Sequence, residues 1–269
     1  MALLDAYERK ARLTPGLLAF APVAFVVATL GLKRFPAISI VGAVVSAAGG
    51  GYVLSVLVGH FGRKAQDKLW ASWGGAPTTR VLRTRETSSN PIQRDAWRSA
   101  IEVVTGVALL SSRREAANPT AADNAIETAV GQVRYIGQDG RFPLVGAENA
   151  QYGLERNLYG FRWCGRLIAA ICMLGLVAIL VVATSSSVRG LSPSALLAGA
   201  IIDGLFLLGW LFIPSAARAQ AAGNRYANQL LQAVVNLSRS GGATGTTQGE
   251  TAKEEPSGSN GKDEGGPAA

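Results

Sequence analysis

The sequence contains few of the side chains that build most catalytic and metal sites. Its 269 residues include two cysteines and one histidine, His60. No Cys-x-x-Cys pair occurs, which excludes the usual zinc sites rich in cysteine and histidine. A Ser-His-Asp or Cys-His arrangement would have to use His60, which stands beside a hydrophobic block without an evident partner. We therefore expect no metal, no cofactor and no enzymatic activity.

Charged residues are also scarce. They make up 16% of the chain, whereas apolar residues make up 48% and the mean hydropathy is +0.22. A soluble domain usually carries about a quarter charged residues. The apolar residues are gathered in blocks as well, and this combination indicates an integral membrane protein.

Four of these blocks are long enough to cross a bilayer, which takes about 20 apolar residues in a helix. They lie at about 13–32, 38–61, 167–186 and 195–214. Short segments join the first block to the second and the third to the fourth, so we predict two helical hairpins. The predicted all-α chain consists of an N-terminal segment with the first hairpin (1–61), a helical domain (62–166), the second hairpin (167–214), an amphipathic helix (215–239) and a disordered tail (240–269).

The basic residues predict the orientation of the chain in the membrane. Of the 26 lysines and arginines, 23 lie before the first block, in the helical domain or after the last block. The other three, at the hairpin tips, are Lys33, Arg34 and Arg189. Because basic residues favour the cytoplasmic side, we expect both termini and the helical domain to be cytoplasmic.

The second block contains a regular pattern of small residues. Gly42, Ser46 and Gly50 recur every four residues and therefore share one face of a helix. Small residues at this spacing let two helices approach closely in lipid, so we interpret the pattern as a packing seam. The alternative is a hinge or the lining of a pore.

The fourth block contains a carboxyl group, Asp203. Such a group is costly inside a membrane and is often functional. One interpretation is a structural aspartate that faces Thr29, Ser39 or Ser46 in the bundle. The alternatives are a group that handles ions or protons, and a residue that lies nearer the membrane interface than its block suggests.

Between the second and third blocks the chain is predicted to form helices and turns. Two helices are expected to begin at Asn-Pro pairs, Asn90-Pro91 and Asn118-Pro119, with asparagine as the capping residue. Before them, Gly74, Gly75 and Pro77 predict a turn, because glycine accepts positive φ and proline cannot continue a helix. Thr78 or Thr79 is then expected to cap a short following helix.

Two tryptophans precede this turn, Trp70 and Trp73. They share one helix face and are expected to cover the turn or to lie at the membrane surface. A functional alternative is an anion site, in which the Gly-Gly amides and the threonine hydroxyls act together with Arg80 and Arg83.

A second polar cluster stands just before the third block. It contains Glu148, Asn149, Tyr152, Glu155, Arg156 and Asn157, mostly three or four residues apart. We predict a hydrogen-bonded seam against another helix, with a ligand site shared with the Trp-Gly-Gly turn as the alternative. Both segments adjoin the membrane on the same side, so they are candidates for neighbours.

The two polar segments also carry a resemblance. The pattern W-x-S-W-G-G-x-P-T-T-x-x-L-R, followed by E-N-x-x-Y-G-x-x-R-N, is similar to a group of uncharacterised bacterial membrane proteins with four spans. The resemblance covers roughly residues 14–215. It implies two membrane hairpins around a cytoplasmic insert in a bacterial inner membrane, and it implies no particular activity.

After the last block, Tyr226, Leu230, Val234 and Leu237 share one face of a predicted helix, which would pack on the helical domain or lie on the membrane. From about Ser240 the chain has almost no apolar residues and is expected to stay unfolded. Taken together, the patterns favour a non-enzymatic membrane scaffold, sensor or effector. Its expected partners are the lipid bilayer and either another protein or a second copy, without specific nucleic-acid binding. The alternative is a small channel or transporter that uses Asp203 and the glycine-rich second span.

Overall fold

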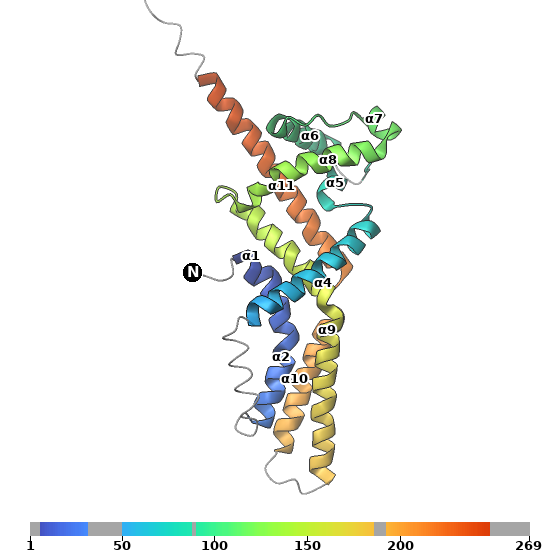
Figure 1. Ribbon diagram of the computed structural model, residues 1–269, viewed down its shortest axis with the longest axis vertical. Coiled ribbons are helices and arrows are strands. Elements are labelled where there is room, and N and C mark those ends of the chain that lie inside the picture. Colours follow the sequence, from blue (N-terminus) through green and yellow to red (C-terminus); the bar gives the residue numbers. More distant parts are fainter. Residues whose placement is uncertain (1–5, 32–49, 88–89, 186–191, 248–269) are drawn as a thin grey trace, which may run out of the picture.

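The fold is given by a computed structural model, which describes residues 6–31, 50–87, 90–185 and 192–247 (Figure 1). Every regular element in these ranges is a helix, so the all-α prediction is confirmed. The molecule is elongated, with a bundle of long helices at one end and a group of shorter helices at the other (Figure 1).

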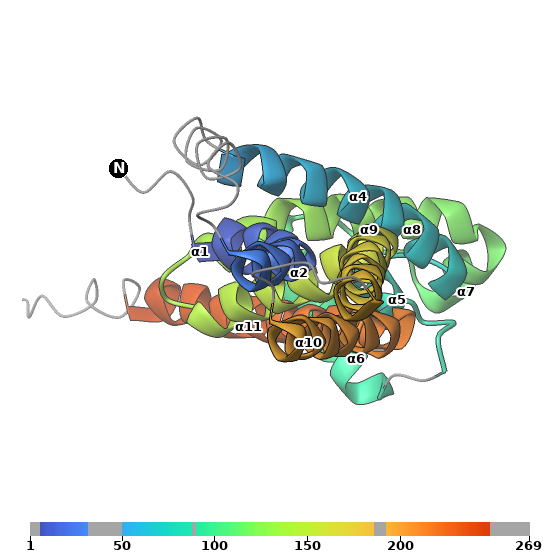
Figure 2. The ribbon, with the colours of Figure 1, turned by 90° about the horizontal axis from the view of Figure 1, so that it is seen from below.

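Three of the described helices are long and apolar enough to cross a membrane. They are η1 with α2 (Arg9–Leu13 and Thr14–Leu30), α9 (Pro143–Ser185) and α10 (Pro193–Phe212). Helix α9 contains residues 167–185 of the predicted span 167–186, and α10 contains residues 195–212 of the predicted span 195–214. Figures 1 and 2 show α2, the lower part of α9 and α10 side by side, and we call this group the span bundle.

The predicted second span is described only in part. Its first half, with Gly42 and Ser46, lies outside the described residues, so the packing seam stays a prediction. The second half belongs to α4 (Gly50–Trp73), which is not one of the three candidate spans. Helix α4 packs mainly on α9 and hardly on α2, and it crosses the molecule obliquely (Figure 1). The charged segment after Phe61 continues the same helix.

Arginine and aromatic side chains mark the upper edge of the span bundle. On α9, the Arg162 guanidinium lies 3.7 Å from the centre of the Tyr159 ring, and Trp163 is exposed. One turn on, Arg166 donates hydrogen bonds to the carbonyl oxygens of Trp210 (3.0 Å) and Leu211 (3.2 Å) at the end of α10. A cation at a helix C-terminus is favourable there, and exposed aromatic rings are typical of a membrane surface.

Beyond this edge lies a group of shorter helices, which we call the polar domain. It consists of α5 (Pro77–Leu82), α6 (Pro91–Thr105), α7 (Ser112–Ala117), α8 (Pro119–Val133) and η3 (Arg134–Gln138). Both predicted caps are confirmed: the Asn90 side chain accepts from the Ile92 amide, and the Asn118 side chain accepts from the Ala121 amide, each at 3.0 Å. Helix α6 ends at Gly106, which has a positive φ of 69°.

The core of the polar domain is completed by α11 (Ala216–Thr247). The predicted apolar face of this helix packs on the polar domain: Leu230 and Val234 are fully buried, and Tyr226 and Leu237 are partly buried. The prediction that the helix ends at 239 is wrong, because it continues to Thr247. A helix already fixed by packing gains one hydrogen bond for each residue that it adds, which explains its extension beyond the last apolar residue.

The core of the polar domain should carry much of its stability. Ile101 is 0% exposed, whereas Ile92, on the same helix, is 81% exposed. We expect Ile101→Ala to lower the free energy of unfolding by about 2–5 kcal/mol, because it leaves a cavity. The matched variant Ile92→Ala should change it by less than about 0.5 kcal/mol. Denaturant unfolding of the detergent-solubilised protein measures both, and equal effects would contradict this assignment of the core.

Candidate functional site

The tryptophan segment forms the predicted turn between α4 and α5. Gly74 has a φ of 78° and Gly75 a φ of 135°, both in the region that favours glycine. The Gly75 amide donates to the Trp70 carbonyl at 2.7 Å, which ends α4. A side chain at Gly75 would also meet the Arg83 guanidinium at 2.8 Å. The turn therefore requires glycine at this position for its conformation, and a side chain there would also displace the Arg83 guanidinium.

The prediction that a threonine caps α5 is wrong. The N-cap residue is Ala76, which has no side-chain cap, and α5 begins at Pro77. Thr78 and Thr79 lie inside the first turn of the helix and are buried. Proline has a preset φ that suits the first helical position, so the helix begins one residue before the threonines.

The two polar clusters predicted from the sequence are neighbours in the structure. The indole N–H of Trp70 donates a 2.8 Å hydrogen bond to the hydroxyl of Tyr152 on α9. The Tyr152 ring stacks on Tyr226 of α11, with 6.3 Å between ring centres. Trp70 therefore ties the end of α4 to α9, close to α11, while Trp73 is half-buried.

The second cluster forms the predicted hydrogen-bonded seam, and its partner helix is α11. Glu155 accepts from Arg218 at 2.8 and 3.1 Å, and Glu148 accepts from Arg225 at 3.3 Å. The two pairs lie seven residues, or two turns, apart on each helix, so α9 and α11 run antiparallel here. Glu155 is buried and Glu148 half-buried, so the inner pair is the better shielded from solvent. Asn149, one position after Glu148, is half-buried.

Deeper in the molecule, three helical segments meet around Asn157, and we call this point the helix crossing. The buried Asn157 amide donates a 2.6 Å hydrogen bond to the carbonyl of Ala11 in η1, which is a π-helical turn. The next side chain back, Arg156, donates to Gln66 of α4. The crossing therefore joins α9 to the N-terminal helix and to α4 at once.

Glycine makes the helix crossing possible. A side chain at Gly62 of α4 would lie 1.7 Å from the Asn157 side-chain oxygen. A side chain at Gly160 of α9 would lie 2.6 Å from the backbone carbonyl oxygen of Phe61. Real Cβ atoms do not approach neighbours this closely, so both positions require glycine.

A network of ionic side chains holds the start of the polar domain. The carboxylate of Asp123 on α8 accepts from Arg83 at 2.8 and 2.9 Å and from Arg85 at 2.8 Å. Glu115 on α7 is fully buried and accepts from the amides of Thr84 and Arg85 at 3.1 and 3.3 Å. These two carboxylates organise the loop that follows α5.

The network engages the arginines of the predicted anion site. Arg83 also donates to the Gly74 carbonyl at 2.6 Å, so its guanidinium bridges the turn and α8. Arg80 lies 3.5 Å from Glu86. Arg98 also joins the network, since it lies 3.7 Å from Glu115 and donates to the Leu82 carbonyl at 2.7 Å. The residues of the site that were not predicted from the sequence are Asp123, Glu115, Arg85, Arg98 and Arg218. No spacing rule points to them, because their partners are mostly remote in sequence.

Comparison with protein-family models, with curated proteins and with solved structures finds no match to this chain. The function must therefore be argued from the geometry.

Asp203 lies near the middle of α10 and is fully buried. Neither carboxyl oxygen has a hydrogen-bond partner among the described residues. Of the predicted partners, Thr29 approaches α10 one turn away, at Gly199, whereas Ser39 and Ser46 lie outside the described residues. Among the described residues, no three histidine, cysteine, aspartate or glutamate side chains are grouped to hold a metal ion.

The helix crossing makes a prediction about packing. We expect Gly160→Ala to destabilise the protein by about 1–3 kcal/mol, because the new methyl group meets backbone atoms of α4 that cannot rotate away. Gly131→Ala on α8 is the control: no atom lies within 4 Å of its added methyl group, so it should stabilise the helix by about 0.5–1 kcal/mol. Melting temperatures in detergent should move in opposite directions, and a shared sign would refute the close approach.

The ionic network predicts a loss of stability in acid. Burial opposes ionisation of Asp123, but the hydrogen bonds from Arg83 and Arg85 outweigh it and lower the pKa of this carboxyl from its ordinary 3.8. Burial also opposes ionisation of Glu115, but bonds from Thr84 and Arg85 lower its pKa from 4.5. Because folding lowers the pKa of both carboxyl groups, the two carboxylates stabilise the folded protein at any pH above their ordinary pKa values. This stabilisation is lost as the pH falls through the lowered pKa values of the folded protein.

The measurement is the melting temperature between about pH 6 and pH 3. We expect Asp123→Asn to be less stable at pH 6 by about 2 kcal/mol and to depend less on pH than the unmodified protein. Glu127→Gln, an exposed change on the same helix, should follow the unmodified protein. If Asp123→Asn shows the full acid sensitivity, the network does not cause it.

Proposed function

We propose that the protein is a non-enzymatic scaffold, sensor or effector of the bacterial inner membrane, which acts through contacts of its polar domain. The polar domain and both termini lie in the cytoplasm in this proposal, since 23 of 26 basic residues fall on that side. The arginines and exposed aromatic rings at the edge of the span bundle support a membrane surface at that level. In this proposal, the part of the second predicted span that lies outside the described residues completes the first of two hairpins.

The observation that carries the proposal is the continuous helical connection between the polar domain and the span bundle. Helix α9 is continuous from Pro143 to Ser185, so it belongs to both. Helix α11 follows α10 after a short link and is fixed on α9 by the Glu155–Arg218 and Glu148–Arg225 pairs. This connection supports the proposal, because a sensor or effector requires a physical link between the polar domain and the spans.

The charge distribution favours protein or lipid partners over nucleic acid. The chain is basic, with a formal charge of +8, but several arginines of the polar domain are paired internally with Asp123, Glu115 or Glu86. Sequence-independent binding of nucleic acid depends on cations that are available to phosphates. The partner is accordingly proposed to be another membrane or cytoplasmic protein, or a second copy of this chain.

A small channel or transporter is the second candidate, and Asp203 favours it. This carboxyl group is buried among candidate spans and has no hydrogen-bond partner among the described residues. Such groups often mark ion or proton paths. Ion flux through liposomes containing the purified protein, abolished by Asp203→Asn, would support this candidate over the first.

The first candidate predicts that function depends on the Glu155–Arg218 pair. Each single variant, Glu155→Arg or Arg218→Glu, places two like charges at 2.8 Å and should loosen α11 from α9. The double variant restores opposite charges. We expect proteins recovered by co-immunoprecipitation from native membranes to be lost with either single variant and regained with the double variant.

Expression blots show whether each variant accumulates in the membrane. The control pair is Asp139→Arg and Arg141→Asp, which reverses an ion pair just after η3, between a half-buried aspartate and an exposed arginine. It should leave the recovered proteins unchanged. If the same proteins are recovered with every variant, the α9–α11 connection has no role in binding them.

A further inference from the structure

The exposed side of α4 changes from apolar to basic along its length. Val53, Leu57, Phe61, Lys64 and Lys68 are spaced three or four residues apart, so they lie in one line along the helix. The three apolar side chains are 38–56% exposed, and both lysines are exposed. A line of exposed apolar side chains marks a contact with another molecule or with a membrane.

The change from apolar to basic occurs at the upper edge of the span bundle. The ring of Phe61 lies 5.6 Å from the ring of Phe161 on α9. The next two residues of α9 are Arg162 and the exposed Trp163, which mark this edge. The chemical boundaries on α4 and on α9 therefore fall at the same level.

Helix α4 also lies across the N-terminal helix and not along it. Positions Gly51 and Gly59 are about 12 Å apart along α4. They lie beside two adjacent residues, since a Cβ atom at Gly51 would be 3.7 Å from Leu13 and one at Gly59 would be 3.5 Å from Arg12. Figure 2 looks along the span bundle and shows α4 at one side of it. Such a course is typical of a helix that lies in the membrane interface.

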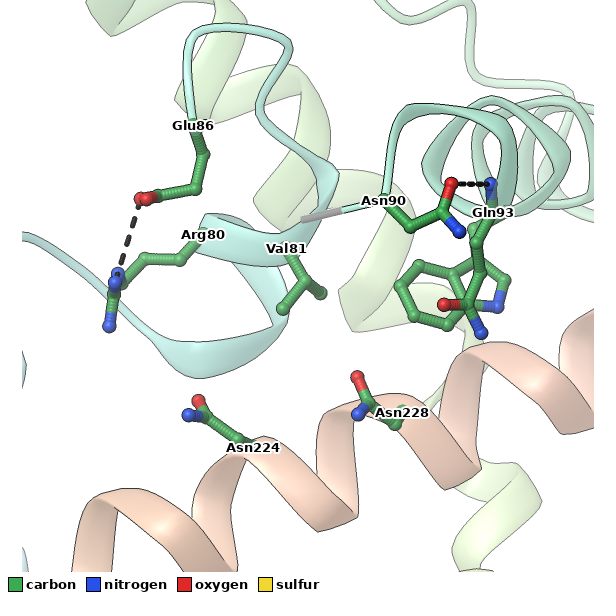
Figure 3. Close-up of a pocket in the computed structure, with 8 residues that line it drawn as sticks. Arg80, Val81, Glu86, Asn90, Gln93, Asn224 and Asn228 are labelled. Carbon is green, nitrogen blue, oxygen red and sulfur yellow. Dashed lines mark hydrogen bonds and ion pairs between the residues drawn. The ribbon is translucent and has the colours of Figure 1, made fainter. Parts of the chain in front are cut away.

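The cations beyond Phe61 are available to a ligand. Among the described residues, Arg63, Lys64 and Lys68 form no ion pair and no side-chain hydrogen bond. In the polar domain, by contrast, Arg80 lies 3.5 Å from Glu86 (Figure 3). The basic residues of α4 are thus free to meet an anion from outside.

A further cation lies beside Arg63. A Cβ atom at Gly59 would lie 3.8 Å from Arg63 Nη1 and 3.5 Å from Arg12 Nε, so the two guanidinium groups flank the same point. Arg12 is paired with Glu8 at 2.9 Å, but Arg63 has no carboxylate partner among the described residues. The clustered positive charge favours an anionic ligand here.

We infer that α4 lies in the membrane interface and binds anionic phospholipids. Its apolar line of Val53, Leu57 and Phe61 enters the boundary of the acyl chains, and Arg63, Lys64 and Lys68 bind the lipid phosphates. Zwitterionic lipids carry a cation beside the phosphate, so they neutralise these side chains less well. The inference rests on the membrane location in the proposed function, and it adds the class of lipid.

The test uses the full-length protein, reconstituted in phosphatidylcholine bilayers that contain brominated phosphatidylglycerol or brominated phosphatidylcholine. Bromine quenches the fluorescence of the tryptophans, and the dependence on lipid fraction gives the relative affinity of the two lipids. We expect phosphatidylglycerol to bind about tenfold or more tighter. High salt should weaken this preference, because it screens the exposed cations.

The double variant Lys64→Gln and Lys68→Gln should reduce the preference about fivefold or more. The matched control is Arg113→Gln with Arg114→Gln, which removes two exposed cations from α7 in the polar domain. It should keep the full preference. Melting temperatures show that both variants are folded, as expected for exposed positions.

The outcomes separate this inference from the proposed function. If the protein inserts into neither bilayer, the membrane location is wrong and the inference falls with it. If it inserts and both brominated lipids quench equally, only the inference is overturned. The same holds if the lysine variant keeps its preference, or if the arginine control loses as much. A lysine variant that keeps its lipid preference but no longer recovers a co-immunoprecipitated protein would assign this face to a protein partner instead.

Discussion

The close approach of α4 to α9 is the constraint on which the rest of the structure depends. At Gly62 and Gly160 the two helices come together so closely that a single methyl group would meet the opposite chain. Asn157 fills the remaining space and binds the Ala11 carbonyl of η1. The direction of α4 is set here, and it determines where the chain can turn at Gly74. The polar domain and the connection to α11 follow from that direction.

The features that the sequence predicts well are local ones. The caps at Asn90 and Asn118 and the turn at Gly74 and Gly75 depend on neighbouring residues, and their chemistry is visible in a short stretch. For Trp70 and Tyr152, the sequence predicts only that their two clusters lie near each other, because both clusters adjoin the membrane on the same side. The bond itself joins residues 82 positions apart.

The features that the sequence does not reveal depend on packing over long distances. Asp123 is paired with arginines 38 to 40 positions earlier, and its own helix gives no sign of this. The oblique direction of α4 cannot be predicted from the sequence for a different reason. The first half of this helix is apolar enough to resemble a membrane span, and only its tertiary contacts with α9 reveal its direction.

The two ends of the molecule are stabilised by different physical means. Small residues and apolar side chains pack the span bundle and the crossing, where Gly165 accommodates Trp210 and Gly199 accommodates Thr29. The polar domain has an apolar core as well, but its entry loop depends on carboxylates buried among arginines. The strongly basic composition therefore serves the interior of the polar domain as well as its surface.

The helix crossing at Asn157 divides α9 into a short arm on the side of the polar domain and a long arm on the side of the span bundle. The helix therefore has the geometry of a lever. Asn157 has 14 residues of the helix before it and 28 after it. At 1.5 Å per residue the arms measure about 21 Å and about 42 Å. Figure 1 shows the short arm inclined to the long one. If the helix pivots at Asn157 as one body, the far end of the long arm travels twice as far as the end in the polar domain. Small displacements of the short arm then become larger ones within the span bundle.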